Sequence, residues 1–212
     1  MKCAIGIAAF IASAATAGTV TVYDADFSVD GIGFDHTSNG NALEASPAVG
    51  PNFTLSYPSI PSSDTTLNFF ITGGGTLTSS DFGGAHSFES FDIDVSQYDE
   101  VSISFINDFL GTDSFNNAPA EFIEYYYTLD GGAQTQFFFF TDDPNGPDLN
   151  ASTFVNVAGV STLRVGLNAN VDGAGDGFDL SSVTVTGTPV PAPATIALTG
   201  LAGLAAARRR RA

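Results

Sequence analysis

The chain has 212 residues and a formal net charge of −17, with one cysteine, one methionine and no tryptophan. All 23 acidic residues lie between Asp24 and Asp179, where Arg164 is the only basic residue, so this span carries a formal charge of −22. Such a surface repels nucleic acid and anionic membranes, which excludes both as partners of the domain. The charge is consistent with solubility in a salty medium, with calcium binding, or with both.

The first 17 residues have the pattern of a secretory signal peptide. Met1 and Lys2 form a short positive start, an apolar run follows, and Ala15 and Ala17 stand at the positions that a signal peptidase reads. The run is shorter than the roughly 20 residues of a membrane-spanning helix. We therefore predict export and cleavage before Gly18, with a buried first helix as the alternative. Cleavage removes the only cysteine, so the domain of residues 18–188 is expected to fold without disulfides.

Residues 18–188 contain short β-rich runs that are separated by Gly, Pro, Asn, Asp and Ser. This pattern predicts a single all-β domain of packed sheets. The expected strands are Thr19–Phe27, Phe53–Tyr57, Thr65–Thr72, Ser87–Val95, Glu100–Asn107, Glu121–Leu129, Gln134–Thr141, Thr153–Val157, Thr162–Asn168 and Ser181–Thr186.

One expected hairpin is readable in detail. Residues 121–141 hold two β-rich runs around a Gly131-Gly132 dipeptide, which suits a two-residue turn with positive φ. A turn at Asp130-Gly131 is the alternative, and it would shift the register by one residue. With the Gly-Gly turn, the core face carries Ile123, Tyr125, Tyr127 and Leu129, and the predicted cross-strand pairs are Tyr125 with Phe138 and Ile123 with Phe140.

The opposite face of this hairpin carries the candidate ligand-binding residues. Tyr126, Phe137 and Phe139 are expected to lie side by side there. Exposed apolar patches usually mark binding sites, so the three residues predict an aromatic platform for a sugar or a partner protein. Cover of this face by loops is the alternative.

Recognisable catalytic patterns are missing from the sequence. His36 and His86 stand in no familiar constellation, and there is no G-x-S-x-G elbow, no H-E-x-x-H and no cysteine nucleophile in the exported domain. A glycosidase needs only two suitably spaced carboxylates. However, Asp92 and Asp94 alternate with apolar residues and fit the solvent face of a strand. We therefore predict that the protein is not an enzyme.

Calcium is the predicted cofactor. The segment DGAGDGFDL, residues 172–180, places three acids and three glycines before the last expected strand. Calcium prefers several carboxylate and carbonyl oxygens, and glycines let the backbone fold around the ion. An ordinary Gly-Asp turn is the alternative. The candidate ligands are Asp172, Asp176 and Asp179, joined by Asp24 and Asp26 if the first and last strands are neighbours.

The order of three segments resembles the galactose-binding-like jelly-roll domains. These segments are FESFDIDVSQYDEVSISF, YYYTLDGG and FDLSSVTVTG, and the resemblance spans residues 87–187. It implies a jelly-roll-like antiparallel β-sandwich, carbohydrate binding, and a structural calcium near the first and last strands. Asp179 stands at the position of the acid in the last strand.

The C-terminal segment, residues 189–212, resembles a PEP-CTERM-type sorting signal of the VPLPA variant. Val190, Pro191 and Pro193 match its motif, with Ala192 where leucine is usual; an apolar segment follows, and Arg208, Arg209, Arg210 and Arg211 form the basic end. The resemblance implies a short hydrophobic helix, transient inner-membrane association, and processing by an exosortase-type enzyme of a Gram-negative bacterium. Arginines after an apolar segment stay cytoplasmic, which agrees with this orientation. A permanent C-terminal anchor is the alternative.

Together these features predict an exported, non-enzymatic protein of the cell surface or extracellular matrix that associates with exopolysaccharide or biofilm. The alternative is a specific calcium-dependent carbohydrate-binding module. A polysaccharide hydrolase is a third possibility.

Overall fold

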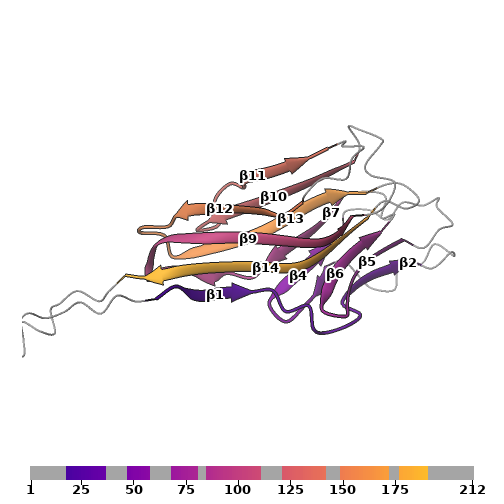
Figure 1. Cartoon of the computed structure of the whole chain (residues 1–212), viewed down its shortest axis with the longest axis horizontal. Helices are drawn as coiled ribbons and strands as arrows, with labels where there is room; N and C mark the ends of the chain where they lie inside the picture. Colours follow the sequence, from indigo (N-terminus) through magenta and orange to yellow (C-terminus); the bar gives the residue numbers. More distant parts are fainter. Residues whose placement is uncertain are drawn as a thin grey trace, which may run out of the picture.

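The computed structural model describes residues 18–36, 47–57, 68–80, 85–110, 121–141, 149–171 and 177–190. In these ranges the regular structure is all β-strand, arranged as two antiparallel seven-stranded sheets (Figure 1). No helix of the described ranges is long and apolar enough to cross a membrane. The predicted signal peptide, the 172–176 part of the calcium segment and the sorting signal after Val190 lie outside them.

The first sheet, sheet A, contains both the first and the last strand of the domain. The described ends of the chain therefore leave the sandwich at the same pole, on the left in Figure 1. Sheet A has the spatial order β12 (Ala151–Asn156), β9 (Tyr98–Leu110), β14 (Gly177–Pro189), β6 (Thr76–Ser80), β5 (Asn68–Gly73) and β2 (Gly33–His36), and β1 (Val20–Asp24) pairs with the C-terminal half of β14.

The second sheet, sheet B, lies against sheet A. It has the spatial order β11 (Thr135–Phe140), β10 (Phe122–Leu129), β13 (Thr162–Asn170), β7 (His86–Ser90), β4 (Phe53–Ser56) and β3 (Ala48–Val49), and β8 (Ile93–Asp94) pairs with β13.

Aromatic contacts join the two sheets into one core. Phe105 on β9 stacks on Tyr125 of β10 with ring centroids 4.3 Å apart, and Phe70 on β5 lies 4.6 Å from His86 on β7. The alternation of strands explains this core: on β13 the buried Leu163, Val165 and Leu167 point inward. Each such large apolar side chain contributes roughly 1.5–3 kcal/mol on burial. The predicted all-β sandwich is confirmed.

All ten expected strands occur, with changed boundaries. The run Ser87–Val95 divides into β7 and β8, and the last strand begins at Gly177 and ends at Pro189. Sequence reasoning missed β2, β3 and β6. β3 has only two residues, and the other two lack the aromatic and β-branched runs by which the other strands were recognised.

The turn of the β10–β11 hairpin lies one residue earlier than predicted, but the predicted cross-strand pairs still form. The turn residues are Asp130 and Gly131, with φ of 48° and 68°, and the Gly132 amide donates to the Leu129 carbonyl at 2.8 Å. Positive φ at both central residues defines the hairpin turn that matches strand twist. The predicted pairs of Tyr125 with Phe138 and of Ile123 with Phe140 nevertheless occur, because irregularities in β11 restore the register.

Candidate functional site

The three predicted ligand-binding residues do not share one surface. A β-bulge leaves Phe137 unpaired opposite Tyr125 and Tyr126, and its ring turns inward to lie 5.9 Å from Phe105. Tyr126 stays on the outer face but is only 2% exposed, because its ring lies flat over Gly166. Phe139 alone remains open to solvent, at 53% exposure. The expected aromatic platform is therefore not formed.

Around Phe139, the outer face of sheet B keeps a smaller mixed surface. Phe139 stacks on Phe122 with ring centroids 6.2 Å apart. In register across the sheet, Phe139 pairs with Glu124, Glu124 with Asn168, and Asn168 with Ser87. A shallow hollow of about 320 Å³ lies beside this row.

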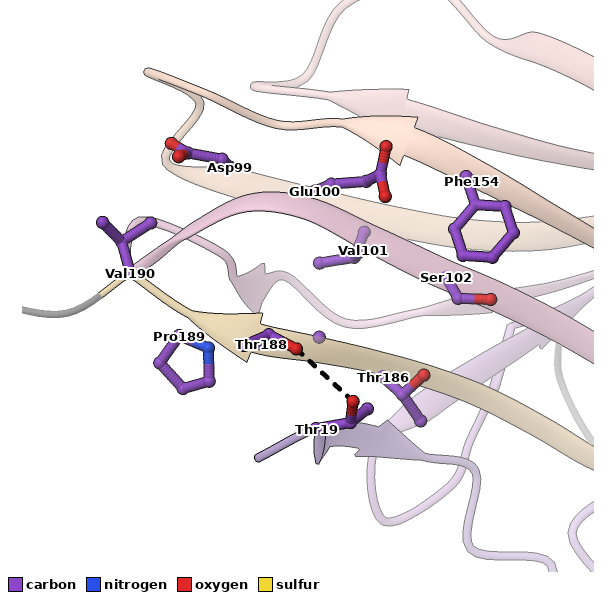
Figure 2. Close-up of a pocket in the computed structure, with 11 residues that line it drawn as sticks. Thr19, Asp99, Glu100, Val101, Ser102, Phe154, Thr186, Thr188, Pro189 and Val190 are labelled. Carbon is purple, nitrogen blue, oxygen red and sulfur yellow. Dashed lines mark hydrogen bonds between the residues drawn. The ribbon is translucent and has the colours of Figure 1, made fainter. Parts of the chain in front are cut away.

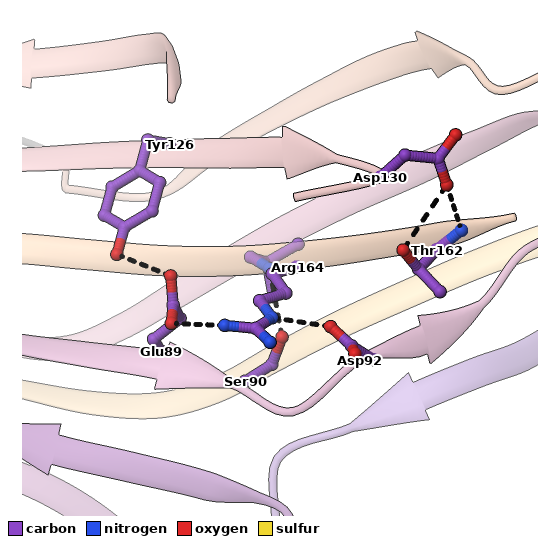
Figure 3. Close-up of polar contacts among 8 residues, drawn as sticks. Glu89, Ser90, Asp92, Tyr126, Asp130, Thr162 and Arg164 are labelled. Atoms are coloured by element: carbon purple, nitrogen blue, oxygen red, sulfur yellow. Dashed lines mark hydrogen bonds and ion pairs between the residues drawn. The ribbon is translucent and has the colours of Figure 1, made fainter. Parts of the chain in front are cut away.

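Arg164, the one basic residue of the acidic span, holds a polar cluster next to Tyr126 (Figure 3). Its Nε donates to Asp92 Oδ1 at 2.6 Å, and its Nη1 donates to Glu89 Oε2 at 3.2 Å. The other oxygen of Glu89 accepts a long hydrogen bond of 3.4 Å from the Tyr126 hydroxyl. Burial of the ring, followed by the charge of Glu89, raises the pKa of Tyr126 above its usual value.

These contacts assign the Arg164 cluster to the stability of the fold. The hydrogen bond to Asp92 raises the pKa of the Arg164 guanidinium, so the group stays charged. Both carboxylates that face it are engaged by its own N–H groups.

A groove on the outer face of sheet A is the better candidate site (Figure 2). It has a volume of about 360 Å³ and runs over β12, β9 and β14 to the first residues of the domain. Phe154 stands on one side, while Thr19 and Thr188 stand on the other with their hydroxyl oxygens 3.4 Å apart. Ser102 and Thr186 lie between them.

Phe154 is the most exposed large apolar side chain of the described residues, at 74%. The alternation along β12 requires this, since Val155 is buried and its neighbour must point outward. The strand itself was predicted, and its two valines, Val155 and Val157, already predict that Phe154 faces solvent. Sequence reasoning nevertheless singled out other aromatics. Ser152 and Asn156 lie on the same face of β12 as Phe154, one on each side of it. Folding alone does not explain why an exposed phenylalanine stands between these two polar residues.

The register of three strand pairs sets the chemistry of the groove. Phe154 pairs with Ser102, Ser102 pairs with Thr186, and Thr186 pairs with Thr21. Directly opposed side chains in a sheet lie roughly 5 Å apart, so an aromatic ring and hydroxyl groups form one continuous row. The hydroxyls donate and accept hydrogen bonds, and the carboxylate of Glu100 at the rim accepts them. This row can bind a ligand that has an apolar face and many hydroxyl groups.

The acidic residues of the predicted calcium site do not all come together. β1 is the neighbour of β14, which was the condition for including Asp24 and Asp26, but Asp24 pairs with Thr184, five positions along β14 from Asp179. At about 3.3 Å per residue this separates the two acids by roughly 16 Å. Asp26 is exposed and accepts hydrogen bonds from the Ser28 amide and hydroxyl, which lower its pKa. Within the described ranges, no three His, Cys, Asp or Glu residues are grouped so that they could hold a metal.

Comparison with known proteins yields structural likeness only. The chain matches no known protein family and no curated protein. An adhesin domain of Lys-gingipain from Porphyromonas gingivalis is similar at 11% identity and a TM-score of 0.37, over 79% of this chain and 97% of that one. The xylan-binding CBM22 domain from Paenibacillus barcinonensis is 12% identical with a TM-score of 0.36, over 84% and 99%.

An enzyme shows the same degree of likeness. A Stig cyclase from Fischerella sp. TAU is 12% identical with a TM-score of 0.40, over 82% of this chain and 100% of that one. Similarity at this level carries no argument about function, so the function has to be inferred from the residues of this chain.

Proposed function

We propose that this protein is an exported, non-enzymatic surface or matrix protein that binds neutral polysaccharide in the groove of sheet A. The observation that carries the proposal is the row of Phe154, Ser102 and Thr186, in which an exposed ring and two hydroxyls lie in register. A sugar ring has an apolar face of C–H groups and a rim of hydroxyls. It therefore matches an aromatic side chain that is bordered by small polar groups.

Charge favours a neutral polymer over an anionic one. The domain has a formal charge of −22, and Asp99 and Glu100 line the groove itself. An anionic polysaccharide would meet repulsion from both the rim and the whole surface, whereas a neutral one has only hydrogen bonds and ring contacts to gain. The ligand class is therefore a neutral, hydroxyl-rich polymer.

Delivery to the cell surface is part of the proposal and rests on the sequence. The signal peptide predicts export, and the sorting signal predicts transient membrane attachment and processing by an exosortase-type enzyme. Val20 pairs with Gly187 where β1 begins and β14 ends, so both processed ends would be at the same pole of the sandwich. The sheet-A groove lies near this pole, because Thr19, Thr188 and Val190 are among the residues that line it.

Affinity electrophoresis of the full chain in gels containing neutral polysaccharides tests the proposed binding. We expect retardation by at least one neutral polymer and at least about a tenfold loss of affinity in Phe154→Ala, since an aromatic anchor in a binding site is typically worth more than 1 kcal/mol. Phe91→Ala is the matched control, because Phe91 is 41% exposed but lies outside the groove. Equal retardation of wild type and Phe154→Ala would refute the assignment of the groove.

A calcium-dependent form of this function is the second candidate, and one observation favours it. Asp179 Oδ1 is buried and has no hydrogen-bond partner among the described residues, and Asp179 comes three residues after Asp176 of the acidic 172–176 segment. A buried carboxylate oxygen without a partner is costly unless an ion or a proton neutralises it. We therefore retain Asp172, Asp176 and Asp179 as proposed calcium ligands.

A further inference from the structure

Two strands at one lateral side of the sandwich have open edges. In the part of the chain that the structure describes, β11 pairs only with β10, and β12 pairs only with β9. Neither Thr135–Phe140 nor Ala151–Asn156 contains a charged residue or a proline. None of the six residues of β11 is buried, whereas half of the residues of its neighbour β10 are buried. Among the described residues each strand therefore has one side without a strand partner, and it lacks the features that normally keep an edge from pairing.

The two open edges lie one above the other. β9 of sheet A faces β10 of sheet B through the stacked rings of Phe105 and Tyr125, and Phe137 of β11 also contacts Phe105. β12 is the next strand after β9, and β11 is the next strand after β10. Both consequently lie along the same side, and in Figure 1 β11 is drawn above β10 and β12 above β9. Facing sheets are about 10 Å apart, which sets the separation of the two edges.

The other strands that pair with a single neighbour are shorter than β11 and β12, and all but β3 contain an aspartate; these strands are β1, β2, β3 and β8. β2, the edge of sheet A, contains Asp35 in its four residues. β3, the edge of sheet B, has only two residues and lies between Pro47 and Pro51. Charges, prolines and very short strands are the usual means of preventing edge-to-edge pairing. The contrast makes the β11/β12 side the one suited to association.

We infer that the β11/β12 side is an interface for a second copy of this chain, which pairs β11 with β11 and β12 with β12. A two-fold axis perpendicular to the sheets makes both pairs antiparallel at once, so each sheet continues into the partner. A single peptide strand could fill only one of the two edges. A second copy presents two edges with the matching separation, and this geometry selects it over other partners.

The charge of the domain makes this association dependent on salt. Two copies of formal charge −22 repel one another, and they can approach most closely where both surfaces are uncharged. The Debye length falls from roughly 30 Å at 0.01 M salt to roughly 3 Å at 1 M. We therefore expect dimerisation to strengthen by at least about tenfold over this range of ionic strength.

Light scattering coupled to gel filtration of the full chain tests the interface. The variant is Gln136→Glu with Ser152→Glu, two exposed residues on β11 and β12 that lie outside the sheet-A groove. The matched control is Val29→Glu with Val49→Glu, which adds the same charge at two exposed positions away from this side. We expect the wild type and the control to be dimers in high salt. The edge variant should dissociate at least about tenfold more readily, because like charges oppose each other across paired strands.

Amide hydrogen exchange gives a second readout that needs no variant. Pairing should slow exchange in β11 and β12 as the protein concentration rises, and it should leave exchange in β2 and β3 unchanged. A monomeric wild type at high salt would overturn the inference. Dimers that persist equally in the edge variant, or that protect other strands, would overturn it as well, because they would place the interface elsewhere in the chain.

Discussion

The close approach of Tyr126 to Gly166 leads to a quantitative prediction. A Cβ atom built on Gly166 would overlap the Tyr126 ring, with Cε1 at 2.8 Å and Cζ and Oη nearer still. The ring cannot move aside freely, since it is 2% exposed and its hydroxyl contacts Glu89. Gly166→Ala should therefore force Tyr126 away from the sheet and lengthen its hydrogen bond.

The expected cost follows from this overlap. Overpacking a well-packed site costs about 1–3 kcal/mol. For a domain of this size each kcal/mol lowers the melting temperature by roughly 2–4 °C, so Gly166→Ala should melt roughly 2–12 °C lower. In a Tyr126→Ala background the overlap is gone, and alanine should be about 0.5–1 kcal/mol better than glycine in a strand. The coupling free energy between the two sites should then be at least about 1.5 kcal/mol.

Urea unfolding of the four proteins of this double-mutant cycle measures the coupling. Gly73→Ala is the control, because a Cβ on Gly73 of β5 meets no atom within 4 Å. Gly73 is the last residue of β5 rather than an interior one, so the change should alter the free energy of unfolding by less than about 0.5 kcal/mol. A neutral Gly166→Ala, or the same cost with and without the Tyr126 ring, would refute the packing that we describe.

Three further predictions concern charged groups. Arg164→Gln should lower the free energy of unfolding by about 0.5–1 kcal/mol at low salt, because it removes two partly exposed ion pairs, with Asp92 and with Glu89. Salt screens such pairs, so this loss of stability should be smaller in about 1 M salt. The backbone amides of Thr162 and Ser161 donate to Asp130 Oδ1 at 2.9 Å, and these hydrogen bonds lower the pKa of Asp130. The ionised carboxylate therefore stabilises the folded state above the ordinary aspartate pKa of about 3.9, and this contribution is lost as the pH falls through the lower pKa of the folded state. Asp130→Asn should therefore show a weaker loss of stability in acid, measured by urea unfolding between about pH 6 and about pH 2; an unchanged pH profile would contradict this. Saturating calcium should raise the melting temperature by roughly 5–10 °C in the wild type and not in Asp176→Asn, and a melting temperature indifferent to calcium and to chelator would remove the proposed site.

The sequence by itself determined the class of fold and much of the core. Alternation is a local property, so Leu163, Val165 and Leu167 could be assigned to the buried face of their strand without knowledge of its partners. The predicted pair of Tyr125 with Phe138 also occurs, but a turn one residue earlier than predicted is compensated by irregularities in the register, which the local pattern does not reveal. The outward direction of Phe154, which the sequence analysis did not single out, follows the same alternation because Val155 beside it points inward.

Only the tertiary structure decided which of the exposed side chains meet. The bulge that turns Phe137 into the core depends on the packing of β11 against Phe105 of the other sheet, and no local pattern encodes it. The row of Phe154, Ser102 and Thr186 joins residues from three strands that are far apart in sequence. Strand order and register are set by long-range burial of the whole core. For this reason the groove and the open β11/β12 side became visible only when the sheets were assembled.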